Sequence, residues 1–150
     1  ITMHRRENHA HMNEWFTVIN DIAKEHSHLN FVFPIHPNPN VQKHKNLLTH
    51  VNVIEPLGYN ELLNMLVKCK FVITDSGGLQ EEGSFFNKRV IVCRKTTERP
   101  EGISTGHSIM CLSPKELKNI VETVNEDYII KEECPYGDGK SAQRIKEILC

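Results

Sequence analysis

Residues 71–82 constrain the fold of this chain more than any other stretch. They open with the β-forming run at residues 71–73, and from Leu79 onward they favour a helix. The turn between them, residues 75–78, carries an Asp and a Ser that can cap the helix, followed by two glycines that leave the backbone open to a ligand. Such a turn presents N–H groups at the positive end of a helix, where phosphates bind. An ordinary strand–turn–helix corner, in which the Ser only caps, fits the same residues.

The rest of the chain alternates between strand-like and helix-like patterns. The strand-like segments are residues 1–3, 30–35, 51–54, 70–74, 89–93 and 108–112. The helix-like segments are residues 8–25, 41–48, 59–67, 79–86, a segment that opens at Ser113, residues 128–131 and residues 141–149. Residues 94–106 are expected to form a long, charged loop. Strands that alternate with helices imply parallel pairing with right-handed crossovers. We therefore predict an α/β fold with a doubly wound, mostly parallel sheet of about six strands.

Four polar segments follow predicted strands, at residues 4–8, 36–39, 75–78 and 94–101. In an open α/β sheet, ligands bind outside the carboxyl ends of the strands. We therefore expect these four segments to meet at one edge of the sheet. Their glycines, arginines and histidines predict a ligand that carries phosphate.

Two of these segments place histidines at the predicted edge. His4 stands beside Arg5, so a group that can donate or shuttle a proton lies next to a permanent cation that binds phosphate. A solvated basic turn, in which Glu7 pairs with an arginine, is the alternative. His36 lies in a loop made rigid by two prolines, which either aims its ring at a ligand or lets it merely pack.

Two further charged residues allow two interpretations each. Glu82 can accept hydrogen bonds from a ribose diol or simply complement the dipole of its helix. Arg99 can bind phosphate or form local ion pairs with Glu98 and Glu101. The glycine turn matches neither G-x-x-x-x-G-K-[ST] nor G-x-G-x-x-G. What remains is a diphosphate held at a helix N-terminus with help from arginine, as in a nucleotide-sugar site.

Composition limits the class of protein. The 150 residues correspond to one typical domain, and a hydrophobic fraction of 39% can supply its core. The formal net charge of −1 gives no general attraction to nucleic acid or to an anionic membrane. Because no signal peptide and no apolar run of about 20 residues are present, we expect a soluble, cytoplasmic protein. The chain opens at Ile1 with what reads as the end of a strand, so we expect it to be a piece of a longer protein.

The cysteines and the clustered histidines do not predict a metal site. The five cysteines are widely spaced and include no C-x-x-C pair, so we interpret them as reduced thiols. His4, His9 and His11 lack a carboxylate or cysteine at ligand spacing, so no metal is expected there.

Five ordered motifs carry a resemblance to a known family. They read H-R-R-E-N, H-P-N-P, T-D-S-G-G-x-Q-E-E, R-x-T-T-E-R-P-E and P-Y-G-D-G, and they span residues 2–148. Together they resemble the C-terminal domain of the non-hydrolysing UDP-N-acetylglucosamine 2-epimerases.

The resemblance implies a fold and an activity. It implies that residues 1–150 form a single Rossmann-like UDP-binding domain, the C-terminal half of a two-domain glycosyltransferase-B architecture whose N-terminal half this sequence lacks. Members of the family interconvert UDP-N-acetylglucosamine and UDP-N-acetylmannosamine without a redox cofactor, by eliminating UDP and adding it back. The implied partners are UDP and UDP-N-acetylglucosamine, and a separate chain that carries the N-terminal half is the alternative to one longer chain.

The resemblance also implies roles for individual residues. His4 would be the catalytic histidine of the cleft, and the other residues would bind the substrate. Arg5 and His36 would be anion contacts that in bacterial members also serve a regulatory substrate molecule. The remaining substrate-binding residues would be Ser76, Gly77 and Gly78 for phosphate, Glu82 for the ribose hydroxyls, Arg99 in the nucleotide site, and Leu57 and Leu62.

The chain departs from the family pattern at several positions. Leu62 stands where the family usually has a Phe that stacks on uracil, which removes a stacking partner. Residues 83–89 replace the common A-P-S-L-G-K-P, and Lys95 replaces an acidic residue. The family's acid and base carboxylates belong to the absent half. A nucleotide-sugar-binding or regulatory module without catalysis is therefore the alternative function, and half of a related glycosyltransferase is a third.

Overall fold

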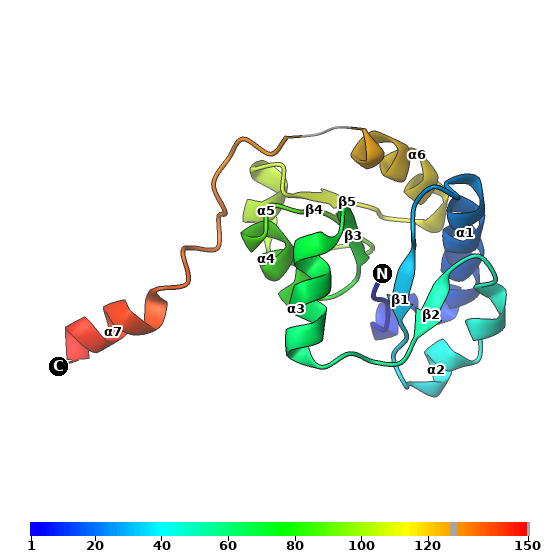
Figure 1. The fold of residues 1–150 in the computed structure, drawn as a ribbon, viewed down its shortest axis with the longest axis horizontal. Coiled ribbons are helices and arrows are strands. Elements are labelled where there is room, and N and C mark those ends of the chain that lie inside the picture. Colours follow the sequence, from blue (N-terminus) through cyan, green and yellow to red (C-terminus); the bar gives the residue numbers. More distant parts are fainter. Residues whose placement is uncertain (127–128, 150) are drawn as a thin grey trace.

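The computed structural model describes residues 1–126 and 129–149, and its strands form two parallel sheets flanked by helices (Figure 1). The strands are β1 (Val32–Pro34), β2 (Asn52–Ile54), β3 (Phe71–Thr74), β4 (Arg89–Val92) and β5 (Ser108–Met110). The helices are the 3₁₀ helices η1 (Arg6–His11) and η2 (Lys45–Leu47), with α1 (Met12–Glu25), α2 (Pro39–Gln42), α3 (Tyr59–Lys68), α4 (Gly77–Phe85), α5 (Pro100–Ser104), α6 (Pro114–Asn125) and α7 (Ser141–Leu149).

The N-terminal segment, residues 1–3, joins two groups of parallel strands. β1 pairs with β2, and β3, β4 and β5 pair in that order, all in parallel. Thr2 pairs in parallel with Thr74 at the end of β3, and the Ile1 amine donates to the Val32 carbonyl in β1 at 2.7 Å. The spatial order is therefore β2, β1, the N-terminal segment, β3, β4, β5. This confirms the predicted α/β fold with a parallel sheet.

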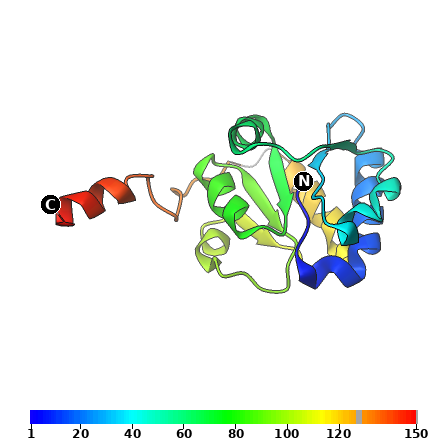
Figure 2. The same cartoon turned by 90° about the horizontal axis from the view of Figure 1, so that it is seen from below.

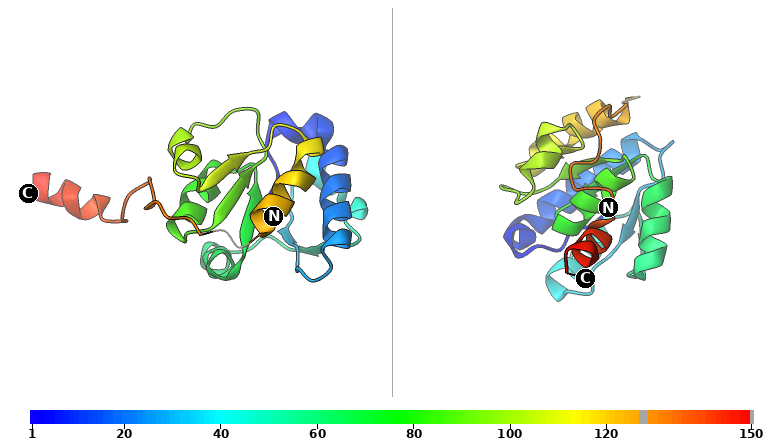
Figure 3. Two further views of the ribbon diagram at one scale, coloured as in Figure 1. Left: turned by 90° about the horizontal axis from the view of Figure 1, so that it is seen from above. Right: turned by 90° about the vertical axis from the view of Figure 1, so that its left-hand side faces the viewer.

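Helices cover both faces of the sheet, as a doubly wound fold requires. Successive strand residues point to opposite faces, so Ile73 and Ile91 pack with the apolar sides of α1 and α6. Val72, Val90 and Val92 pack on the other face in a smaller cluster that includes residues of α3 and α4. Figures 2 and 3 show α1 and α6 side by side on one side of the strands, away from α3.

Several local predictions need correction. Residues 41–48 do not form one helix, because α2 begins at Pro39 and is separated from η2 by a turn. The predicted loop at residues 94–106 contains α5, which starts with a proline at its first position. The helix predicted at residues 59–67 is α3, and the side chain of Val67 on it is exposed. Tyr128 lies outside the described residues, and residues 129–131 are not helical.

The C-terminal helix α7 lies apart from the rest of the chain (Figure 1). None of its described residues is buried, and the apolar side chains of Ile145, Ile148 and Leu149 are exposed.

Among the described residues, no helix has the length and apolar character to cross a membrane. The four cysteines that the structure describes are free thiols, and Cys150 lies outside the described residues.

Candidate nucleotide site

The candidate site lies where the strand order reverses, between the N-terminal segment and β3. The Thr2 amide donates to the carbonyl of Ile73 at 2.9 Å, and the Asp75 amide donates back to the carbonyl of Thr2 at 3.3 Å. Beyond this point the two segments separate: the N-terminal segment continues into η1, and the residues after β3 continue into α4. A reversal of strand order opens a crevice at the carboxyl ends of the strands, and ligands bind there.

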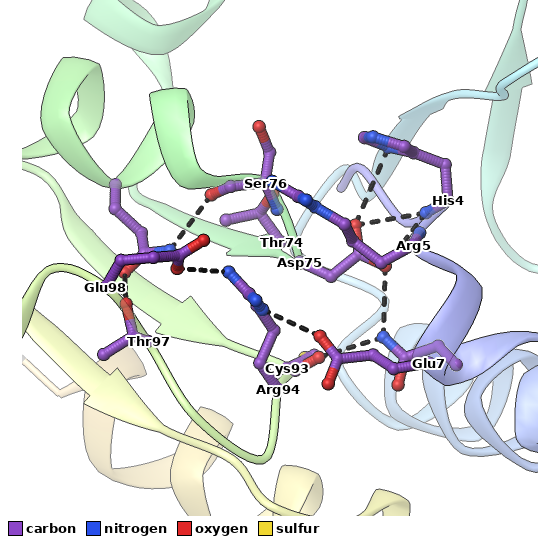
Figure 4. A network of polar contacts seen from close by, with 12 residues as sticks. His4, Arg5, Glu7, Thr74, Asp75, Ser76, Cys93, Arg94, Thr97 and Glu98 are labelled. Carbon is purple, nitrogen blue, oxygen red and sulfur yellow. Dashed lines mark hydrogen bonds and ion pairs between the residues drawn. The ribbon is translucent and has the colours of Figure 1, made fainter.

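Asp75 ties the two sides of the crevice together. Its carboxylate is fully buried and accepts hydrogen bonds from the backbone N–H groups of His4 and Arg5, at 3.0 and 2.8 Å. The side chain of Asn8 also donates to it at 3.1 Å, and the same amide group donates to the Cys93 carbonyl at 3.0 Å (Figure 4). A buried carboxylate is stable only when it is hydrogen-bonded in this way. Sequence analysis predicted a helix cap for Asp75, and this was wrong, because the carboxylate serves the N-terminal loop.

His4 lies between Asp75 and His36. Its Nδ1 is 3.6 Å from the Asp75 carboxylate, and its ring stacks on that of His36 with centroids 4.9 Å apart. Burial lowers the pKa of His4 below its ordinary value of 6.5, and the Asp75 carboxylate opposes this effect, while His36 and Arg5 add to it. The imidazole is therefore neutral at neutral pH, and an anion bound beside it would raise its affinity for a proton.

The glycine turn forms the start of α4, two residues earlier than predicted. Ser76 occupies the N-cap position, but its side chain makes no capping hydrogen bond. Its backbone N–H instead donates to the Thr74 hydroxyl at 2.9 Å. Gly78 is exposed, and a Cβ atom there would meet nothing within 4 Å. The first turn of α4 therefore combines N–H groups that have no partner within the helix with open space beside Gly78, two features of an anion site.

Arg99 lies directly against this turn. A Cβ atom at Gly77 would be 2.6 Å from Nη1 of Arg99, so the guanidinium rests where any side chain at Gly77 would be. Nε of Arg99 donates to the Glu81 carboxylate at 2.5 Å. Ser76, Gly77 and Arg99 therefore meet, although Arg99 follows a different strand. The predicted convergence of polar segments at one edge of the sheet is confirmed.

Arg94 lies at the same edge of the sheet, directly after β4, and bridges two carboxylates. It donates to Glu7 at 2.8 Å and to Glu98 at 2.6 Å, and Figure 4 shows it between these two carboxylates. This bridge was not predicted, since Glu7 and Arg94 are far apart in the sequence.

Arg5 carries an unsatisfied donor. Its Nε is buried and has no hydrogen-bond partner among the described residues, and a buried donor of this kind calls for an acceptor.

Glu82 faces a second part of the site. It lines a cavity of about 270 Å³ together with Tyr59 on α3 and Tyr136 in the segment before α7. The negative charge of Glu82 raises the pKa of Tyr59 above its ordinary value of 10.0. Glu82 is thus positioned to accept from a hydroxyl group, which agrees with either interpretation of this residue.

Leu57 and Leu62 lie less close to the other predicted residues. Leu57 is half-buried in the loop that follows β2, at the same edge of the sheet. Leu62 lines another cavity, of about 390 Å³, which it shares with Leu79 of the first turn of α4. The roles of both leucines stay predictions.

The family model described as UDP-N-acetylglucosamine 2-epimerase matches residues 1–150. The chain belongs to the UDP-N-acetylglucosamine 2-epimerase family. The epimerase of Campylobacter jejuni is 36% identical to it, over 99% of this chain and 42% of the relative. The chain thus spans less than half the length of this epimerase.

Solved epimerase structures have the same fold. The Neisseria meningitidis UDP-GlcNAc 2-epimerase bound to UDP-GlcNAc superposes with a TM-score of 0.89 at 34% identity, covering 99% of this chain and 43% of that one. The Methanocaldococcus jannaschii UDP-GlcNAc 2-epimerase in complex with UDP-GlcNAc and UDP gives 0.82 at 30% identity, with 99% and 43% covered. The predicted membership of the epimerase family is confirmed, while the roles of single site residues stay predictions.

Proposed function

We propose that residues 1–150 form the single UDP-binding domain of a UDP-N-acetylglucosamine 2-epimerase. In this proposal the diphosphate lies on the first turn of α4, with His4 and Arg5 on one side and Arg99 on the other, and Glu82 takes the ribose hydroxyls. The observation that carries it is the position of the Arg99 guanidinium against Gly77. A permanent cation and a helix N-terminus there act on the same anion, and the relatives bind UDP or UDP-GlcNAc.

This half of the site is suited to stabilising a leaving diphosphate. Elimination of UDP develops negative charge on the diphosphate, and preorganised N–H groups and arginines lower the free energy of that charge. His4, neutral at neutral pH, can donate an N–H hydrogen bond to the same group.

Removal of the C2 proton needs a base within hydrogen-bond reach, and the nearby carboxylates are engaged elsewhere. Asp75 is buried and occupied by the N-terminal loop. Glu7, Glu81 and Glu98 each pair with an arginine. We therefore assign the base to the half of the protein that these residues do not include, supplied in the same chain or in a second one.

Titration calorimetry with UDP tests the binding site. Arg99→Ala removes a charge-assisted contact, typically about 1.5–3 kcal/mol, so the dissociation constant for UDP should rise about ten- to a hundredfold. Lys118→Ala is the matched control, because Lys118 on α6 pairs with Glu25 on α1, on the face of the sheet opposite α4, and its loss should leave UDP binding unchanged. Equal affinity of the Arg99 variant and the parent would count against the assigned site.

A complementation assay separates the enzyme from the binding module. The chain is mixed with a separately produced N-terminal half of an epimerase, and conversion of UDP-N-acetylglucosamine is followed. Restored turnover supports the epimerase. UDP binding without turnover favours the non-catalytic module, which needs no base and therefore also fits carboxylates that are paired with arginines.

A further inference from the structure

Tyr136 reaches from the C-terminal segment into the start of α5. Its hydroxyl donates to the carbonyl of Arg99 at 3.3 Å and accepts from the backbone N–H of Gly102 at 3.0 Å. The N–H groups in the first turn of a helix have no partner within the helix, so the phenol caps α5 from outside. Burial raises the pKa of Tyr136 above its ordinary value of 10.0, and the hydroxyl therefore stays protonated and able to donate.

The phenol fits its position closely. A Cβ atom at Gly102 would be 2.5 Å from the Tyr136 hydroxyl and 3.0 Å from the Ser108 hydroxyl. Any side chain at Gly102 would push the phenol away. The glycine thus admits Tyr136 to the backbone of α5.

Arg99 depends on its backbone for the placement of its guanidinium. It is the N-cap residue of α5, its side chain makes no capping bond, and its N–H donates to the Thr97 hydroxyl at 3.2 Å. The arginine side chain has many rotamers, so the guanidinium can occupy many positions. A fixed backbone limits these positions and reduces the conformational entropy lost when a ligand binds. On the other side of this residue, the Tyr136 hydroxyl donates a hydrogen bond to the Arg99 carbonyl oxygen.

We propose that Tyr136 is a positioning residue for Arg99, holding the start of α5 so that the guanidinium lies over Gly77 and meets the diphosphate. The inference rests on the proposed function, because it assigns Arg99 to the phosphates. It gives the P-Y-G-D-G motif a part in UDP binding although its tyrosine lies 37 residues beyond Arg99.

The test compares UDP with uridine, which lacks the phosphates. Tyr136→Phe removes only the hydroxyl, and we expect the dissociation constant for UDP to rise about five- to tenfold. Tyr136 lines the cavity beside Glu82, but the hydroxyl that is removed is bonded to the backbone of α5. Uridine binding, followed by NMR titration, should therefore stay within about twofold of the parent value, since Arg99 acts on the phosphates in this proposal. Thr123→Val on α6 is the matched control for loss of a hydroxyl and should change neither ligand.

A double-mutant cycle distinguishes positioning from general stabilisation. In an Arg99→Ala background, Tyr136→Phe should have no further effect on UDP affinity. Gly102→Ala displaces the phenol without removing it, and should reproduce the UDP-specific loss without adding to that of Tyr136→Phe. Thermal unfolding of each variant establishes that it is folded.

The outcomes separate this inference from the proposed function. Equal weakening of UDP and uridine by Tyr136→Phe, or additivity with Arg99→Ala, would overturn the positioning role alone. A parent chain that does not bind UDP would overturn the proposed function, and the inference with it.

Discussion

Gly77→Ala is the sharpest perturbation that the site offers. A methyl group at this position would be 2.6 Å from Nη1 of Arg99, whereas ordinary contact begins at 3.4 Å. The guanidinium must therefore retreat by about 0.8 Å, which stretches a hydrogen bond of about 2.9 Å beyond the usual limit. Loss of this charge-assisted contact should raise the dissociation constant for UDP about tenfold or more.

The stability of the Gly77→Ala variant should change little. Only a flexible, partly exposed guanidinium has to move, and the ion pair between Arg99 and Glu81 is worth about 0–1 kcal/mol at such exposure. Gly83→Ala is the contrasting variant on the same helix, because its methyl would be 2.6 Å from the Val90 side chain in the core. Overpacking there costs about 1–3 kcal/mol, partly offset by the better helix propensity of alanine.

Titration calorimetry with UDP and urea unfolding measure the two effects separately. We expect Gly77→Ala to lose UDP affinity at nearly parental stability, and Gly83→Ala to lose stability. A Gly77→Ala variant that binds UDP as tightly as the parent would show that the guanidinium is not part of the site, and the steric argument would fail.

Three further predictions concern the charges of the crevice. Asp75→Asn replaces an acceptor that faces the donors of the N-terminal loop by an N–H₂ group, and should lower the free energy of unfolding by about 2–4 kcal/mol. Urea unfolding measures this loss, and the exposed Asp138→Asn is the control that should change little. Burial lowers the pKa of both His4 and His107 below 6.5, so at pH values below about 6.5 the unfolded chain binds more protons than the folded one. The free energy of unfolding should therefore fall as the pH drops below about 6.5. A constant urea midpoint from about pH 7.5 to 5.5 would contradict this. UDP binding at pH 6.5 should take up protons at His4, which calorimetry in buffers of different ionisation enthalpy detects, and His4→Gln should abolish the uptake.

Much of the fold and the convergence of the site follow from local sequence patterns. The apolar strand runs, separated by helices, leave right-handed parallel crossovers as the only common topology, and the carboxyl ends of the strands then meet. His4, Ser76 and Arg99 lie together for this reason, although 95 positions separate the first from the last. This part of the prediction required no knowledge of side-chain contacts.

The contacts that fix the site depend on tertiary structure, and local patterns misassigned them. Asp75 before Ser-Gly-Gly is typical of a helix cap, yet its partners come from residues at the other end of the crevice. Residues 100–104 were assigned to a loop because they are too short for a helical period to show, and α5 is held from outside by Tyr136. A buried carboxylate directly after a core strand was the available signal for the first case, while nothing local pointed to the second.

The acidic residues around the arginines orient these cations rather than block them. Glu81 engages Nε of Arg99 at the edge of the guanidinium, whereas Nη1 lies over Gly77 at the start of α4, with the Glu98 carboxylate 3.9 Å away. The opposite edge of the planar group is therefore directed to the place where the helix N-terminus attracts an anion. A diphosphate can bind there while Glu81 keeps its hydrogen bond, so the position of Arg99 is set before the ligand arrives. In the proposed site, such preorganisation would reduce the entropy lost when the diphosphate binds.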